Sequence, residues 1–160
     1  MPVYCPSGGL WEDALAALVP SDLRVFLDLP PGSALRISGD FGLILAFLPG
    51  APYLEDLYDR WPGRVLAPPH DPHLLRASLE LAAAGGRLPR PVPRSGLAPR
   101  ERQVLRLLVS GLAPRAIAQE LGISAGTVHA YLGVLREKLA APTTSALVAA
   151  YYGLPLHQDF

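Results

Sequence analysis

Two hydroxyl side chains mark the most informative segment of the chain, Pro114–Gly133. Ser124 and Thr127 follow Gly122 and precede a stretch with helical apolar spacing, so we expect them in the first turn of a helix. There, hydroxyls and unpaired backbone N–H groups can bind phosphate. The polar side chains expected to complete this DNA-binding face are Arg115, His129, Tyr131, Arg136 and Lys138.

The same segment has the spacing of a helix-turn-helix. This motif needs a small residue where its two helices cross, a glycine in the turn, an apolar residue after it, and a second helix with an exposed face. Ala118, Gly122, Ile123 and Val128 occupy these places in order. A packed bundle without a ligand is the alternative, and the spacing favours DNA binding.

Helical patterns surround this core, residues 114–133, on both sides. We expect helices over Pro99–Ser110 and Pro114–Leu121, a third from the Ser124 cap to Leu139, and a fourth from Thr143 or Thr144 to Tyr152. Proline opens the first two, and a glycine follows each of them. The predicted domain, residues 97–156, is therefore all-α with four helices.

Residues 97–154 resemble the LuxR-type (GerE-like) output domain of response regulators and quorum sensors. The resemblance rests on Leu97-Ala-Pro-Arg-Glu-Arg-Gln-Val-Leu105, Leu121-Gly-Ile-Ser124, Thr127-Val128 and Lys138-Leu139. It implies a sequence-specific transcriptional regulator that binds double-stranded DNA. The family's last helix often supplies a dimer contact, which here would involve Thr144, Leu147, Val148 and Tyr151. A homodimer would place two recognition helices about 34 Å apart.

The chain departs from the family at several contact positions. His129 stands where Lys is usual, Gly133 and Val134 replace positions that are often polar or basic, and Glu137 replaces a basic residue. His129 is mostly neutral at pH 7 because the unperturbed pKa of histidine is about 6.5. Alanine occupies the two customary N-cap positions, Ala98 and Ala113, at a cost of about 1 kcal/mol each. The alternative function is therefore a protein-interaction or dimerisation module that no longer binds DNA tightly.

The first 87 residues alternate strand-like and helix-like stretches, which predicts a parallel sheet covered by helices. The expected strands are Met1–Cys5, Arg24–Leu27, Leu43–Leu48 and Arg64–Leu66, and the expected helices are Leu10–Val19, Tyr53–Trp61 and Pro72–Ala84. The proline-rich stretch 88–96 reads as a semi-rigid linker. The fold class is thus a truncated flavodoxin-like α/β domain followed by the four-helix domain.

The N-terminal stretch is also similar to a receiver domain, with the strand Leu43–Leu48 aligned to the receiver's third strand. Phosphoryl acceptance needs a strand-end Asp, acidic residues that hold Mg²⁺, and a Lys. In this alignment the acceptor falls on Leu45, Ala46 or Phe47, and the chain's only lysine is Lys138. We therefore expect an atypical receiver without a phosphoacceptor, regulated by dimerisation or by binding a protein or small molecule.

Composition and charge limit the remaining classes of function. Residues 1–94 carry eight Arg against ten Asp and Glu, and residues 95–160 carry five Arg and one Lys against four Asp and Glu. The lone Cys5 cannot form an internal disulfide, and no apolar run reaches the roughly 18 residues that span a membrane. His70-Asp71-Pro72-His73 lacks a third metal ligand, and no nucleotide-binding or nucleophile motif is present. We expect a cytoplasmic protein that is not an enzyme and has no metal or cofactor.

Overall fold

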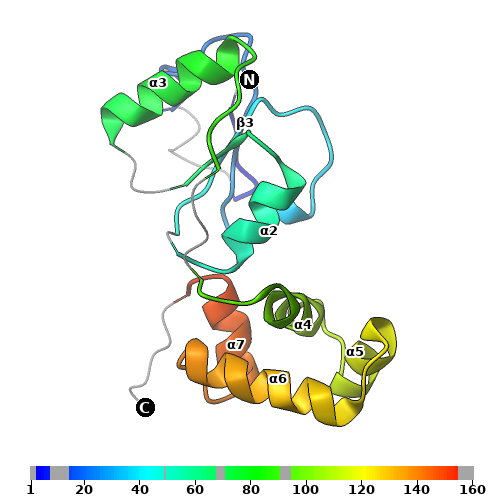
Figure 1. The fold of residues 1–160 in the computed structure, drawn as a ribbon. Helices are drawn as coiled ribbons and strands as arrows, with labels where there is room; N and C mark the ends of the chain where they lie inside the picture. Colours follow the sequence, from blue (N-terminus) through cyan, green and yellow to red (C-terminus); the bar gives the residue numbers. More distant parts are fainter. Residues whose placement is uncertain (1–2, 8–14, 49, 68–70, 91–94, 155–160) are drawn as a thin grey trace. The chain divides into compact units, whose positions relative to one another are not determined.

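The computed structural model describes residues 3–7, 15–48, 50–67, 71–90 and 95–154. The chain divides into two compact units, residues 1–93 (unit 1) and 94–160 (unit 2), and the division falls within the predicted linker. Each unit is described by itself (Figure 1).

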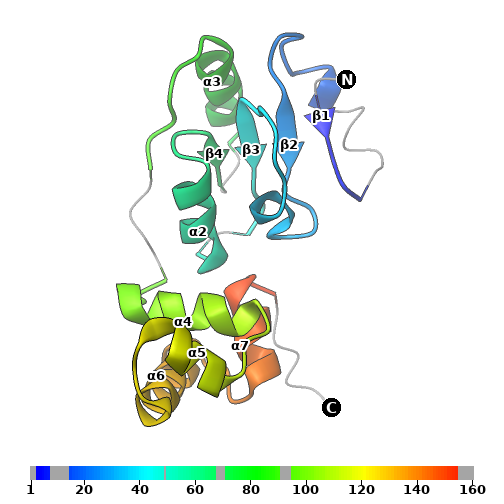
Figure 2. The same cartoon turned by 90° about the vertical axis from the view of Figure 1, so that its right-hand side faces the viewer.

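Unit 1 is built on a four-stranded parallel sheet with the order β1-β2-β3-β4 (Figure 2). The strands are β1 Val3–Tyr4, β2 Val25–Leu27, β3 Leu43–Leu45 and β4 Val65–Leu66. Val25 pairs with Val3 on one side and with Leu43 on the other, so β2 is a central strand. All residues of β2 and β3 are buried, as the continuous apolar runs predicted.

Helices cover both faces of this sheet. On one face, Val25 and Leu27 pack into an apolar cluster with Leu79 of α3, which spans Pro72–Ala83. On the other face, the ring of Phe26 lies 5.2 Å from that of Phe41, and Phe41 lies 6.3 Å from Trp61, the residue that follows α2 (Tyr53–Arg60). The predicted parallel α/β architecture is confirmed. Part of the helix expected over Leu10–Val19 lies outside the described residues.

Unit 2 consists of α4 Pro99–Val109, α5 Pro114–Leu121, α6 Ala125–Lys138 and α7 Thr144–Tyr151. These bounds agree with the predicted helices to within about a residue at each end. The turn between α5 and α6 needs glycine because Gly122 has φ 64°, a left-handed conformation that a side chain disfavours. Val104, Ile117, Val128 and Leu147, one from each helix, are fully buried in the core.

The two alanine N-caps differ in how the structure compensates for them. Glu101 accepts a hydrogen bond of 2.8 Å from the backbone N–H of Ala98, so half of a capping box survives at the start of α4. Ala113 provides no side-chain cap for α5. The loss of helix stability predicted for an alanine N-cap is therefore partly offset at α4. At α5, Pro114 at the first helical position is the remaining feature that favours the helix start.

Candidate nucleic-acid interface

The N-terminus of α6 presents the two hydroxyl groups that the sequence singled out. Ser124 Oγ accepts a hydrogen bond of 3.0 Å from the backbone N–H of Thr127, and the two hydroxyl oxygens lie 2.8 Å apart. Both residues are exposed. Because two hydroxyls share one hydrogen bond, one O–H hydrogen stays available to an outside acceptor. Helix geometry leaves the N–H groups of Ala125 and Gly126 unpaired as well, so this end of α6 can bind a phosphate.

The other predicted contact residues in this part of unit 2 differ in exposure. Arg115, in the first turn of α5, and His129 are exposed, whereas Tyr131 and Arg136 are half-buried. The Nε atom of Arg136 is buried and has no hydrogen-bond partner within the described residues. Of the two arginines in the predicted set, Arg115 is therefore the exposed one.

Lys138 is placed differently from the sequence interpretation. Its Nζ lies 2.8 and 3.0 Å from the two carboxylate oxygens of Glu101, and it also donates to the carbonyl oxygen of Gly96 at 3.2 Å. The hydrogen bond from Lys138 holds the pKa of Glu101 below its usual range. Lys138 thus ties the end of α6 to the start of α4. The sequence could not show this because Glu101 is 37 residues away.

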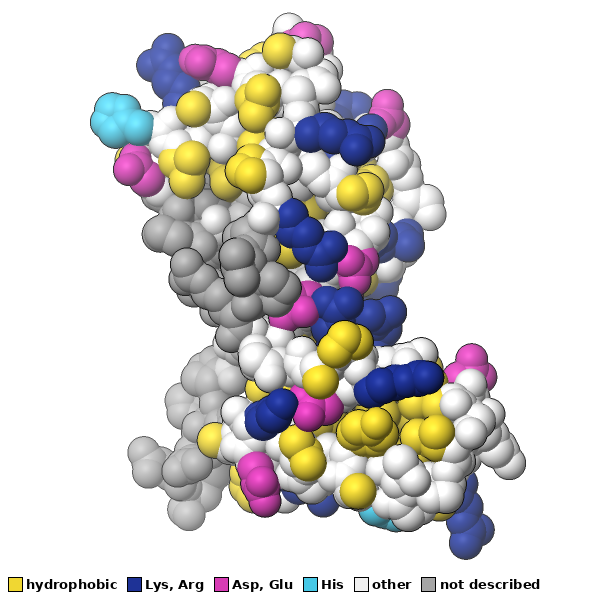
Figure 3. Space-filling model, viewed as in Figure 1, with side chains coloured by type: hydrophobic (Ala, Val, Ile, Leu, Met, Phe, Trp, Pro, Cys, Tyr) yellow, Lys and Arg dark blue, Asp and Glu magenta, His cyan; other side chains and the backbone are white. Residues whose placement is uncertain are grey.

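The charge on the visible face of unit 2 is sparse. In Figure 3 the Lys and Arg side chains of this unit are separated by apolar and uncharged atoms and form no continuous basic patch. The face of α6 opposite its buried residues, Val128, Leu132 and Leu135, carries one charged side chain, that of Glu137.

The predicted dimerisation residues of α7 fall into two groups. Leu147 and Tyr151 are 0% and 2% exposed, so they belong to the core of unit 2 and offer no surface to a partner. Thr144 is exposed and Val148 is half-buried. A contact through α7 would therefore use Thr144 and Val148.

Unit 1 contains a strand-end carboxylate that the sequence interpretation missed. Asp28 follows β2 directly and is fully buried. Its Oδ1 accepts hydrogen bonds from Ala34 N at 2.7 Å and Ser33 Oγ at 3.1 Å, and its Oδ2 accepts one from Gly32 N at 2.9 Å. Leu45 also ends a strand, β3, so two strand ends fit the acceptor position and the alignment to Leu45 stays a prediction. The overlooked signal is the apolar run Val25–Leu27, which ends on an Asp and is followed by prolines.

The surroundings of Asp28 make its carboxylate a structural group. Both oxygens hold the turn that includes the short 3-10 helix η1, Ser33–Leu35. Tyr53 of α2 lies close enough that burial, followed by the negative charge of Asp28, raises the pKa of its hydroxyl above its usual range. Asp28 is thus enclosed by donors from its own loop, and no lysine exists in unit 1 to pair with a phosphoryl group.

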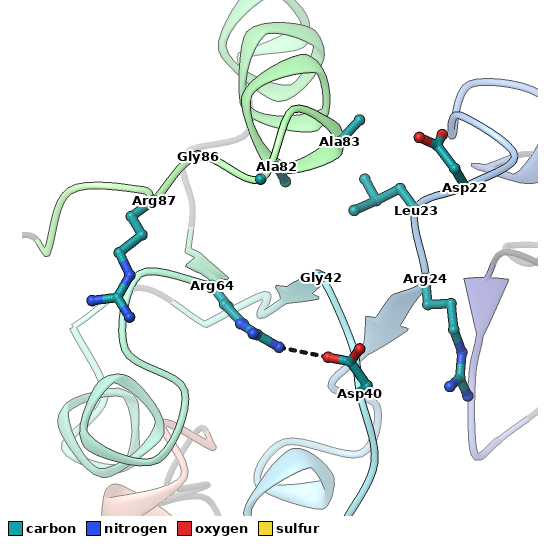
Figure 4. Close-up of a pocket in the computed structure, with 11 residues that line it drawn as sticks. Asp22, Leu23, Arg24, Asp40, Gly42, Arg64, Ala82, Ala83, Gly86 and Arg87 are labelled. Atoms are coloured by element: carbon teal, nitrogen blue, oxygen red, sulfur yellow. Dashed lines mark hydrogen bonds and ion pairs between the residues drawn. The ribbon is translucent and has the colours of Figure 1, made fainter.

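A cavity of about 250 Å³ lies beside the sheet in unit 1 (Figure 4). Arg64, just before β4, donates to Asp40 at 3.0 Å and to the carbonyl oxygen of Phe41 at 2.8 Å. The side chain of Leu23 and the C-terminal end of α3, at Ala82 and Ala83, complete the wall shown in the close-up. In this small cavity Arg64 and Asp40 form an ion pair, and Asp22, Arg24 and Arg87 are further charged residues of its lining.

The described residues contain no group of three or more His, Cys, Asp or Glu side chains arranged to hold a metal ion. Asp71 of the sequence His70-Asp71-Pro72-His73 caps α3 instead, and accepts a hydrogen bond of 2.8 Å from the backbone N–H of His73. Among the helices of the described part, none is long and apolar enough to cross a membrane.

Unit 2 is thus a helix-turn-helix domain by its α5-turn-α6 geometry and by the exposed, capped N-terminus of α6. Residues 95–150 match the family model of the LuxR family of bacterial regulatory proteins, GerE. These residues form a LuxR-family helix-turn-helix domain, as the sequence resemblance implied.

Relatives with similar sequences are transcriptional regulators. The chain is 48% identical over 54 residues to the transcriptional regulatory protein FixJ of Azorhizobium caulinodans, covering 34% of this chain and 26% of the relative. It is 40% identical over 52 residues to the transcriptional regulatory protein MctR of Rhizobium johnstonii, covering 32% and 24%. The chain therefore spans about a quarter of the length of these relatives.

Solved structures of response regulators are more distant. Full-length FixJ from B. japonicum is 24% identical with a TM-score of 0.33, covering 86% of this chain and 78% of that one. The RcsB–DNA complex is 16% identical with a TM-score of 0.39, covering 89% and 80%.

Proposed function

We propose that the chain is a DNA-binding transcriptional regulator that uses the N-terminus of α6 to engage double-stranded DNA. The observation that carries the proposal is the pair Ser124 and Thr127, exposed at a capped helix start inside a LuxR-family domain. Arg115 would add a phosphate contact, and His129, Tyr131 and Arg136 would complete the contact surface. Lys138 has a smaller part because Glu101 and Gly96 already hold its ammonium group.

Because this surface carries few basic side chains, the salt dependence of its DNA binding can be predicted. Each neutralised phosphate contributes about −0.9 to the slope of log K against log salt concentration. If Arg115 and Arg136, the two arginines of the predicted contact set, each neutralise one phosphate, we expect a slope of about −2 for one domain and about −4 for a homodimer.

A salt titration of the purified full chain against a pool of random 30-base-pair duplexes tests the proposal. We expect retention at low salt, weaker binding and a smaller slope for Arg115→Ala, and unchanged binding for Arg76→Ala, whose site in unit 1 is also exposed. Absence of binding by the wild-type chain at low salt would contradict DNA binding and favour the alternative, a protein-interaction or dimerisation module.

We further propose that unit 1 regulates without phosphorylation. Asp28 is buried and both of its oxygens accept hydrogen bonds from its own loop, so an attacking carboxylate would have to break them. Incubation with acetyl phosphate should leave the mass of the intact protein unchanged. An adduct that maps to Asp28, and that Asp28→Asn abolishes, would contradict this proposal.

Without phosphorylation, the regulatory signal received by unit 1 would be a partner protein, a second copy of the chain or a small molecule. The cavity lined by Leu23, Arg64 and Ala82 is the place we propose for a small regulator. A homodimer through α7 would use Thr144 and Val148 at its surface. Sedimentation of wild type and Val148→Glu would test the dimer, since a buried charge at a symmetric contact should shift it to monomer.

A further inference from the structure

The outward face of α6 carries almost no hydrogen-bonding side chains. Because a helix repeats every 3.6 residues, the positions opposite buried Val128, Leu132 and Leu135 are those of Gly126, Ala130, Gly133 and Glu137, with Val134 beside them. Ala130 is exposed, and Val134 is 37% exposed. This face therefore presents the methyl groups of Ala130 and Val134, the space left by the two glycines, and the carboxylate of Glu137.

Packing within the domain does not explain the gaps. A Cβ built at Gly133 would meet no atom within 4 Å, and one at Gly126 would make only an ordinary contact of 3.6 Å with Ser124 Oγ. Glycine in a helix interior is less favourable than alanine, so Gly133 weakens α6 without a benefit to the core. What the absent side chains do permit is a close approach by another molecule.

The chemistry of the DNA major groove identifies a matching target. Polar side chains read its donors and acceptors, whereas the C5-methyl group of thymine is read by apolar contact. Resting on the proposed function, we propose that α6 recognises thymine methyl groups, with Ala130 and Val134 as the residues that determine specificity.

The position of these residues along α6 suits that role. The hydroxyls of Ser124 and Thr127 lie at the helix start, where phosphate contacts fix the orientation of a recognition helix. Ala130 and Val134 follow one turn apart on one face, about 6 Å from each other along the axis. This spacing covers roughly two base-pair steps of 3.4 Å, so each residue faces its own step.

Replacement of thymine by uracil removes only the methyl group and tests the proposal directly. The purified full chain is used to enrich binders from a pool of random 30-base-pair duplexes, and the enriched duplexes are resynthesised with uracil. We expect affinity to fall about fourfold for each thymine methyl group that packs against α6. Val134→Ser should reduce this preference for thymine, whereas Leu74→Ser, at an exposed apolar site in unit 1, should leave it unchanged.

The outcomes separate this inference from the proposed function. Equal affinity for the thymine and uracil duplexes, or binding to the pool without enrichment of any sequence, overturns thymine recognition and leaves DNA binding intact. No binding to the pool at low salt overturns both. Because Val134 is on the surface, thermal unfolding of Val134→Ser within a few degrees of wild type confirms that a reduced preference for thymine reflects the interface.

Discussion

Asp28 in unit 1 directly follows the strand β2, and Ser124 in unit 2 directly precedes the helix α6. The side chain of each accepts hydrogen bonding from backbone N–H groups. Asp28 is fully buried, and its two oxygens are occupied by Gly32, Ser33 and Ala34. Ser124 is exposed, and it shares one hydrogen bond with the hydroxyl of Thr127. Burial therefore decides whether such a residue closes a loop or remains available to a ligand.

The comparison extends to the units around them. Unit 2 keeps the apolar scaffold of its helix-turn-helix, while the outward face of α6 carries Ala130, Val134, Glu137 and two glycines. Unit 1 keeps a carboxylate at a strand end, but the surrounding loop uses it as an internal cap. A family scaffold thus persists when side chains that act on other molecules change, because core packing does not depend on them.

The largest effect that would test this contrast is expected for Asp28→Ala. The change leaves two buried N–H groups and the Ser33 hydroxyl without their acceptor, so unfolding should become easier by about 3 kcal/mol. Urea unfolding followed by circular dichroism measures it. Asp40→Ala is the control, since that carboxylate is 90% exposed and should cost under about 0.5 kcal/mol. If Asp28→Ala and Asp40→Ala lowered the free energy of unfolding by the same small amount, Asp28 would not be a structural cap.

Lys138→Met should destabilise unit 2 by about 1 kcal/mol at pH 7, because Glu101 loses its ion pair while keeping its bond to Ala98. The pKa of Glu101 is lowered in the folded protein, so the pair contributes above the ordinary glutamate pKa of about 4.3 and loses its contribution as the pH falls through the lowered value.

Unfolding of wild type and Lys138→Met, measured from pH 7 down to pH 3, should therefore converge at the acidic end. A variant that unfolds like wild type throughout, but has a smaller salt slope in DNA binding, would show that Lys138 contacts phosphate in place of Glu101.

Gly133→Ala should stabilise α6 by about 0.5–1 kcal/mol, because the added methyl group meets no neighbour and alanine favours a helix. The same change should weaken binding to enriched duplexes if the gap admits DNA. The matched change Gly111→Ala tests a glycine outside α6 that needs φ 95°, and it should destabilise. Tighter DNA binding by Gly133→Ala would argue against a close approach at this position.

The smallest effect is expected for Glu137→Gln, which removes the single charge from the outward face of α6. Relief of repulsion from phosphates should raise affinity for the random duplex pool about two- to threefold at low salt, with little change at high salt. Glu120→Gln, which removes a negative charge from an exposed position of α5, is the variant with which Glu137→Gln is compared. A loss of affinity would instead indicate that Glu137 accepts a hydrogen bond from a cytosine amino group.

Much of the fold could be predicted because local patterns specify it. Apolar spacing with Pro114 and Gly122 at the ends defined α5, and the runs around Val25 and Leu43 defined the central strands. The start of α6 followed from its cap, Ser124, for the same reason. The sequence analysis overlooked Asp28 because two apolar runs, Val25–Leu27 and Leu43–Leu48, fit the strand before the acceptor position, and a run by itself does not show which loop encloses its end.

The sequence by itself determined the two fold classes, the helix-turn-helix and the replaced basic positions at His129 and Glu137, since these depend on residue type and short-range spacing. Only the tertiary structure decided that Lys138 pairs with Glu101, that Leu147 and Tyr151 are core residues, and that Asp28 is closed within its loop. Those properties depend on contacts between segments and on exclusion from water, which periodicity along the chain does not record.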